Sequence, residues 1–302
     1  MNPGLGIALK VSSVIAFVVM AAIIKWLSTN IPTGQIMFFR ASIAVFIILA
    51  WVAKSDAITT SLRTERYGGH FLRALLGTSS MACTFAALHY LPLPDATAIN
   101  YASPLLTVAL GAVLIGEVVR AFRWFTVLLG LVGVLIVLYP QVGQQTDTGA
   151  MIGAALALAG AVLAAGAQVQ IRRLIKLERS ATIVFYFSIN ATFLALLSLP
   201  FGWVMPNAMQ LTGLVSIGLL GGFGQLMLTN SYRFADAAIV APFEYTSMLI
   251  AVVLGVWLFD DIPTMYTYVG TAIIIIAGVL IIWREHYLGL ERTRPRRANT
   301  PS

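Results

Sequence analysis

AINYASPLLTVALGAVLIGE, the stretch from Ala98 to Glu117, decides the fold, because its pattern returns in the second half of the chain. The returning copy is PFEYTSMLIAVVLGVWLFDD, from Pro242 to Asp261. At one constant offset the matched pairs are Tyr101 with Tyr245, Ser103 with Ser247, Leu105 with Leu249, Leu110-Gly111 with Leu254-Gly255, and Glu117 with Asp261. Each copy is apolar and long enough for a helix that crosses a bilayer, which takes about 20 residues. The repeat therefore predicts two related membrane-spanning halves.

The composition places the rest of the chain in a membrane as well. Of its 302 residues, 59% are hydrophobic and 10% are charged, whereas soluble domains have roughly 25% charged residues. Ten apolar stretches predict transmembrane helices at 6–27, 34–53, 70–90, 96–115, 122–140, 149–171, 181–201, 209–231, 237–259 and 265–283. Because each half has five spans, an odd number, the second half begins on the opposite side of the membrane from the first. The predicted fold class is an all-α membrane protein with ten transmembrane helices in two inverted five-helix repeats.

The predicted organisation leaves no room for a soluble domain. The first repeat is expected at 1–140, the second at 149–284, and a basic cytoplasmic tail without regular structure at 285–302. The first apolar run, Ile7 to Leu27, is expected to remain as a helix, because it is too long for a typical signal peptide. The single cysteine, Cys83, excludes a disulfide within the chain.

Lys and Arg alternate between the predicted loops. The regions 54–73, 116–123 and 172–179 and the tail are basic, and Arg233 follows the eighth span. The loops at 28–33, 91–95, 141–148, 202–208 and 260–264 contain no Lys or Arg. Because cytoplasmic loops collect these residues, both termini are expected in the cytoplasm, in a bacterial-type inner membrane. The same rule accounts for the net charge of +7, so no nucleic-acid partner is expected.

Three short motifs add to this layout. An Arg follows two aromatics in the second span, as Phe38-Phe39-Arg40; a Pro lies in the fourth span, as Pro104; and an acid closes that span after Gly, as Gly116-Glu117. With the ten-span, two-repeat pattern, these motifs resemble the EamA branch of the drug/metabolite transporter superfamily. The resemblance covers nearly the whole chain and implies a transporter of small molecules. The second repeat departs from the pattern, with Phe187 where Arg40 would align and Asp261 in place of Glu.

The opening stretch GIALKVSSVIAFVVMAAIIKW is more narrowly similar to a subgroup of that branch, which includes bacterial riboflavin and S-adenosylmethionine uptake carriers. Its markers in this sequence are Lys10, Met20 and Lys25. This similarity makes riboflavin uptake the first substrate prediction.

Ionisable residues inside the spans need a reason, because each costs roughly 3 kcal/mol to insert. Glu244 lies about 12 Å into the ninth span, at 1.5 Å per residue, and its repeat mate is Asn100. Arg40 lies inside the second span, where it could hold an anionic substrate group or serve as the counterion of Glu244. Lys25, near the end of the first span, is expected to extend toward the interface.

Aromatic residues flank the polar pair. Tyr101 and Tyr245 adjoin Asn100 and Glu244, and two such rings would favour a planar ring substrate such as a flavin. A nucleoside, an aromatic amino acid or many drugs would fit equally. The candidate substrate-binding residues are Tyr101, Asn100, Glu244, Tyr245, Arg40, Lys25 and Trp26.

These observations predict a secondary transporter that moves a small organic metabolite by alternating access, and not an enzyme. No catalytic constellation, metal spacing, cofactor motif or nucleotide-binding loop stands out. The alternatives within the class are an exporter or importer of another metabolite, such as an amino acid, S-adenosylmethionine or a drug. From other classes, an intramembrane enzyme would need clustered catalytic residues, and a scaffold would not need the buried Glu244. Proton or ion coupling and a homodimer are left open.

Overall fold

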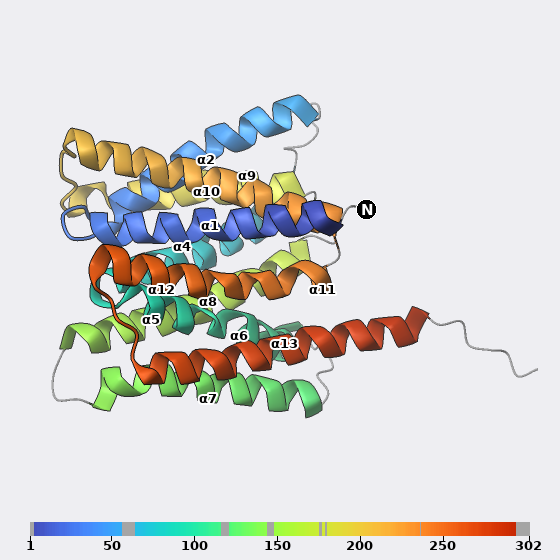
Figure 1. The fold of residues 1–302 in the computed structure, drawn as a ribbon. Coiled ribbons are helices and arrows are strands. Elements are labelled where there is room, and N and C mark those ends of the chain that lie inside the picture. The colour runs from blue at the N-terminus through green and yellow to red at the C-terminus, as the bar shows by residue number, and fades with distance from the viewer. Residues whose placement is uncertain are drawn as a thin grey trace, which may run out of the picture.

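The polypeptide forms long helices joined by short loops, as shown by a computed structural model (Figure 1). The structure describes residues 3–55, 64–115, 121–143, 148–174, 177–178, 180–235 and 237–293. Within these residues there is no strand. The helices of the first half are α1 (Pro3–Leu27), α2 (Thr33–Ser55), α4 (Tyr67–Tyr90), α5 (Leu93–Asn100), α6 (Ala102–Ile115) and α7 (Ala121–Gly143).

The second half has the same order of elements. Its helices are α8 (Thr148–Leu174), α9 (Ser180–Leu196), the 3₁₀ turn η1 (Leu199–Phe201), α10 (Ala208–Phe234), α11 (Ala237–Val240), the 3₁₀ turn η2 (Ala241–Tyr245), α12 (Thr246–Phe259) and α13 (Met265–Thr293). In the described chain, nine spans are long and apolar enough to cross a membrane, and α9 is a shorter apolar helix. The predicted fold of ten transmembrane helices in two inverted repeats is confirmed.

Two predicted boundaries are corrected. The seventh span ends as an α-helix at Leu196 rather than at residue 201, and η1 follows it. The last helix continues past residue 283 to Thr293, and the first proline after residue 283 is Pro295. The prediction that the tail lacks regular structure is therefore wrong for residues 285–293, and residues 294–302 lie outside the described part of the chain.

The helix contacts follow the repeat. Helix α1 packs along α10, and its repeat mate α8 packs along α4, the mate of α10. Helices α2 and α9, which are mates, pack on each other, as do the mates α7 and α13. Exchanging the two halves thus reproduces the main contacts, which is the arrangement expected for two copies related by a pseudo-twofold axis.

Glycines bring α7 and α13 together. A Cβ atom at Gly133 would lie 2.7 Å from the carbonyl oxygen of Gly270, and one at Gly270 would lie 2.5 Å from that of Gly133. Such distances leave no room for a side chain, so the two backbones touch directly.

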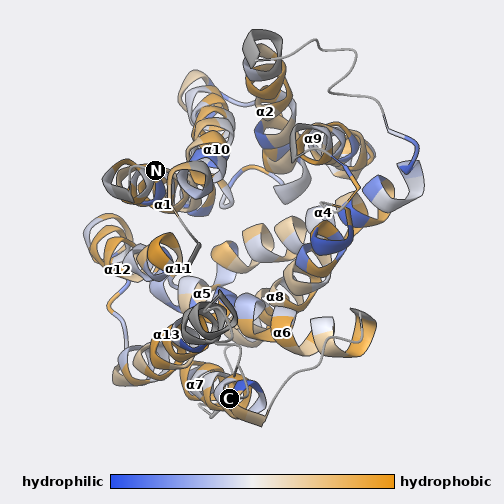
Figure 2. Cartoon of the chain, turned by 90° about the vertical axis from the view of Figure 1, so that its right-hand side faces the viewer, coloured by the Kyte–Doolittle hydropathy of each residue, from blue (hydrophilic) through white to orange (hydrophobic). Residues whose placement is uncertain are grey.

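The outer surface of the bundle is apolar, as a lipid-facing surface must be. Phe46 and Trp257, for example, are 71% and 78% exposed. Seen end-on, the helices are largely hydrophobic, with hydrophilic stretches on α2, α4 and α10 (Figure 2). The first residues of α1 and the last residues of α13 lie at the same face of the bundle, called here the terminal face; the other is called the far face (Figure 1).

Candidate functional site

The fourth and ninth spans are both interrupted at equivalent positions. Helix α5 ends at Asn100 and α6 begins at Ala102, with Tyr101 in a turn between them. Pro104 explains this break, because it has no N–H to donate to the carbonyl of Asn100 and its ring crowds that carbonyl. In the ninth span, η2 separates α11 from α12 and contains Pro242. The interruptions place polar side chains and free backbone groups inside the bundle.

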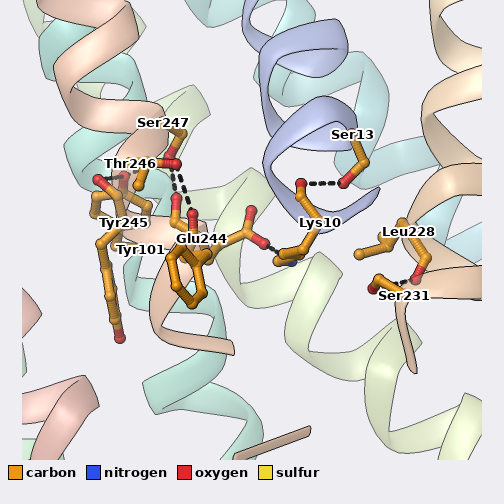
Figure 3. A network of polar contacts seen from close by, with 10 residues as sticks. Lys10, Ser13, Tyr101, Leu228, Ser231, Glu244, Tyr245, Thr246 and Ser247 are labelled. Carbon is orange, nitrogen blue, oxygen red and sulfur yellow. Dashed lines mark hydrogen bonds and ion pairs between the residues drawn. The ribbon is translucent and has the colours of Figure 1, made fainter. Parts of the chain in front are cut away.

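An ion pair joins the first span to the interrupted ninth span. The ammonium group of Lys10 donates to Oε2 of Glu244 (Figure 3). The Lys10 side chain is only 2% exposed, whereas that of Glu244 is 47% exposed. Ser13 donates to the Lys10 carbonyl at 2.7 Å, one turn along α1. Because a cation buried this deeply needs a partner, Glu244 is the group that makes Lys10 tolerable inside the bundle.

The two repeat-matched tyrosines lie beside this pair. Their rings meet edge to face, with centroids 5.3 Å apart and planes at 73°. The hydroxyl of Tyr101 lies 2.5 Å from Oγ of Ser247, which in turn donates to the Glu244 carbonyl at 2.6 Å. The structure thus brings Tyr101 and Tyr245 together, but in direct contact, so a planar ring does not fit between them in this state.

Polar groups at the interruptions are accessible at the surface of the helices. Asn100 is exposed, Tyr245 is partly buried and Glu244 is nearly half exposed. Tyr101 next to them is buried, as are the flanking residues Ala98, Ile99 and Ala102. The site therefore combines an accessible amide and carboxylate with an apolar floor, which is the composition of a binding site for a small molecule.

A second ion pair lies at the far face. Nζ of Lys25 is 2.9 Å from Oδ2 of Asp261 and donates to the carbonyl of Leu91 at 2.7 Å. The same carboxylate oxygen accepts the Leu93 N–H at 2.9 Å, at the start of α5, where the helix dipole favours an anion. Asp260, in the left-handed conformation with φ 55°, ends α12 just before Asp261. Lys25 is thus bound within the protein rather than extended toward the interface, which corrects that prediction.

A hydrogen bond between the fourth span (α5) and the tenth span (α13) reinforces this face. Oγ1 of Thr267 donates to Oδ1 of Asp95 at 2.7 Å, and both residues are buried. With the Lys25–Asp261 pair, it joins residues of both repeats at the far face. We call the four residues Lys25, Asp261, Asp95 and Thr267 the far-face latch.

The other predicted site residues lie elsewhere. Arg40 contacts α10 at Gly221 and does not serve as the counterion of Glu244, a role taken by Lys10. Trp26 is 38% exposed and packs near Gly213 on α10. Sixteen residues separate it from Lys10, about 24 Å along α1. Trp26 is therefore not brought to the Glu244 site.

Several contributing residues do not stand out in the sequence. Lys10 lies near the predicted start of its span, where a cation is ordinary, so it is noticeable only as a marker of the family subgroup. Ser247 is a visible repeat mate of Ser103, but a serine alone signals nothing about its partner. Glu117, at the end of the fourth span, lies outside the described residues. Among the described residues, no group of three or more His, Cys, Asp or Glu could hold a metal ion.

A two-repeat helical bundle with an ion pair at interrupted spans defines a membrane carrier. The chain belongs to the EamA-like transporter family, whose model matches residues 4–139 and 151–284. It is a multi-pass membrane transporter of small metabolites.

Individual relatives extend over nearly the whole chain. The pseudopaline exporter of Pseudomonas aeruginosa is 30% identical over 91% of this chain and 95% of its own. The riboflavin transporter of Vibrio cholerae is 27% identical over 88% and 89%, and the S-adenosylmethionine uptake transporter of Rickettsia prowazekii is 26% identical over 86% of each chain. One crystal structure has the same fold, with a TM-score of 0.66 at 19% identity, covering 95% of this chain and 99% of its own.

Proposed function

We propose that this protein is a secondary transporter that moves a small organic metabolite by alternating access. The substrate would bind at Lys10, Glu244, Asn100 and Tyr245, between the two repeats. One observation carries the proposal: the side chain of Glu244 is 47% exposed at an interrupted helix, while the far face is joined by an ion pair whose side chains are only 16% and 14% exposed. A site open at one end and latched at the other is what alternating access requires.

The proposal assigns a direction to this state. In the proposed orientation both termini are cytoplasmic, in the inner membrane, because the basic regions lie on that side. The terminal face is then the cytoplasmic face, and the structure corresponds to an inward-open state. Release of the far-face latch, together with closure over Glu244, would give the outward-open state.

Riboflavin uptake is the first substrate to test. Its support is the Vibrio cholerae relative and the two tyrosines at the site. For a flavin ring to stack on them, the edge-to-face contact between Tyr101 and Tyr245 would have to open. Pseudopaline export and S-adenosylmethionine uptake, carried out by other relatives at similar identity, are the rival substrates.

The Lys10–Glu244 pair also suggests how transport could be coupled. Protonation of Glu244 would break the pair and free Lys10 for a substrate anion, so that binding of the proton and binding of the substrate would favour each other. Loss of pH dependence in Glu244→Gln, with binding retained, would identify this carboxylate as the proton site.

The test uses the purified full-length chain in proteoliposomes. Counterflow of labelled riboflavin, S-adenosylmethionine and amino acids reports transport directly. Tyr245→Ala should raise the half-saturating riboflavin concentration several-fold, since an aromatic contact contributes about 1 kcal/mol, and Tyr245→Phe should have a smaller effect. Riboflavin-auxotrophic bacteria carrying the gene should grow on low external riboflavin. Failure of rescue with the protein present in the membrane would reject riboflavin uptake, and absence of counterflow with every compound would reject the transport proposal for this panel.

A further inference from the structure

Two arginines face the interior of the bundle away from the Lys10–Glu244 pair. Arg40 lies on α2, one turn from Ile36, which is fully buried, and one turn from Ala44, which is 7% exposed. Arg73 lies on α4, next to the fully buried Ala74. Both arginines are themselves only partly exposed. Their guanidinium groups thus extend from helix faces that pack inside the protein.

Close packing holds each side chain in place. A Cβ atom at Gly221 of α10 would lie 3.3 Å from Cγ and 3.5 Å from Nε of Arg40. The guanidinium carbon of Arg73 lies 3.7 Å from the ring centroid of Phe187 on α9. Phe187 is the residue that aligns with Arg40 in the second repeat. At this aligned position the first repeat therefore has a cation, Arg40, and the second repeat has an aromatic ring, Phe187, on which Arg73 stacks.

Neither arginine has an acidic partner among the described residues. Nε of Arg40, and Nε and Nη1 of Arg73, are buried without a hydrogen-bond partner. Two acids inside the bundle already have lysine partners, since Glu244 binds Lys10 and Asp261 binds Lys25. Arg40 and Arg73 also lie close enough for the charge of one to act on the other. Keeping two like charges close together inside the bundle without a counterion is costly, so the arrangement favours the binding of an anion.

We infer that Arg40 and Arg73 form a subsite for an anionic group, a carboxylate or a phosphate, of the transported metabolite. The inference rests on the proposed transport function and narrows its substrate class. Guanidinium groups bind both kinds of anion through paired N–H donors, and stacking on Phe187 fixes the plane of Arg73. A substrate with one or more negative charges would supply the missing counterion.

The subsite lies along the proposed path, beyond the first ion pair. Met20 packs with Arg40 around Gly221. It is ten residues after Lys10 on α1, or about 15 Å further from the terminal face, and five residues before Lys25. An anionic group bound by the arginines would therefore sit between the Lys10–Glu244 pair and the far-face latch.

The test measures anion-dependent stabilisation of the full-length protein. Melting temperatures are recorded in detergent with increasing inorganic phosphate, succinate or citrate, and with succinamide as the uncharged match of succinate. At least one anion, but not succinamide, should raise the melting temperature in a saturable manner. Arg40→Gln and Arg73→Gln should each raise the half-saturating concentration about tenfold, the equivalent of about 1.4 kcal/mol. Arg40→Lys, which retains the charge but loses the paired donors, should lie between these and the wild type.

Arg66→Gln is the matched control, because Arg66 is an exposed arginine just before α4. It should leave the anion response unchanged. Each variant is compared with its own ligand-free melting temperature, so a change in basal stability does not mimic lost binding. Equal responses in all variants, or no saturable response in the wild type, would overturn the subsite. Stabilisation in phosphatidylglycerol nanodiscs but not by soluble anions would also overturn it, since a lipid headgroup would then be the counterion.

Transport assays separate this inference from the proposed function. Riboflavin counterflow that is unaffected by Arg40→Gln and Arg73→Gln, combined with no anion response, would reject the subsite and keep the carrier. Anion binding that depends on both arginines, without counterflow of anions or of any other compound tested, would keep the anion site and reject the proposed function for the compounds tested.

Discussion

Nζ of Lys25 lies 2.9 Å from Oδ2 of Asp261, so an ion pair joins the end of the first span to the end of the ninth. Both side chains are less than one-fifth exposed, and the carboxylate also caps the start of α5. The contact connects one repeat to the other at the face that the proposed inward-open state must keep closed.

Removing the negative charge from this pair should open the far face. Asp261→Asn keeps an acceptor for the Leu93 N–H but leaves Lys25 unpaired, which for a buried pair costs about 3–5 kcal/mol. In a Cys83→Ala background, Thr97→Cys on α5 should react faster with an impermeant maleimide added from the far face. The double variant Lys25→Asp with Asp261→Lys, in which the two charges are exchanged, can form the ion pair again and should slow the maleimide labelling. Unchanged labelling in Asp261→Asn would show that the pair does not hold this face closed.

Variants of the Lys10–Glu244 pair should distinguish its effect on stability from its effect on transport. Lys10 is 2% exposed, so Glu244→Gln leaves a buried cation without its partner and should lower the melting temperature by several degrees. The double variant Lys10→Met with Glu244→Gln should recover most of that loss but remain inactive in counterflow. Activity in the double variant would contradict a direct role of the pair in transport.

Gly278 should control the position of Tyr245. A methyl group at residue 278 would collide with the Tyr245 hydroxyl, and overpacking of this kind costs roughly 1–3 kcal/mol. We expect Gly278→Ala to reduce both the melting temperature and transport. Adding Tyr245→Phe should restore much of the loss, because it removes the oxygen that collides. A Gly278→Ala variant that behaves like the wild type would contradict this packing.

The glycine contact between α7 and α13 should tolerate no side chain on either side. Gly133→Ala and Gly270→Ala should each destabilise the protein by similar amounts, since each new Cβ meets the other helix's carbonyl at 2.7 Å and 2.5 Å. Gly68→Ala is the control, because nothing lies within 4 Å of a Cβ at that position. Thermal unfolding of the three variants measures the difference, and equal melting temperatures would rule out the direct backbone contact.

Cysteine labelling in intact cells can test the proposed orientation. In the Cys83→Ala background, Met205→Cys lies in a loop without Lys or Arg, where Met205 is 96% exposed, and should react from outside. Glu65→Cys lies in a basic loop and should react only after permeabilisation. The reverse pattern would invert the topology and, with it, the assignment of an inward-open state.

The sequence predicts the fold well because the dominant signals are local. Apolar stretches identify the spans, and the match of Tyr101 with Tyr245 correctly pairs two residues that touch in space. The interruptions of the fourth and ninth spans are harder to predict, although Pro104 and Pro242 mark them, because proline is tolerated in membrane helices.

The pairing of charges could not be predicted, because it depends on how distant helices rotate against one another. Glu244 is 234 residues from Lys10 along the chain, and the sequence offers Arg40 as an equally reasonable partner. Lys25 looks like an interfacial lysine until α12 places Asp261 beside it. Arg73 draws no attention near a basic loop, yet its guanidinium lies over Phe187 inside the bundle.

The contact between Gly133 and Gly270 has a consequence for how the two halves can move. In an inverted repeat, the outward-open state is obtained by letting each half adopt the conformation that the other half has in the inward-open state. That exchange gives most helices different neighbours, but two helices that are repeat mates and pack on each other, such as α7 and α13, remain neighbours. Under the proposed alternating access, we therefore expect the α7–α13 seam, like the seam between the mates α2 and α9, to persist while the remaining helices rearrange.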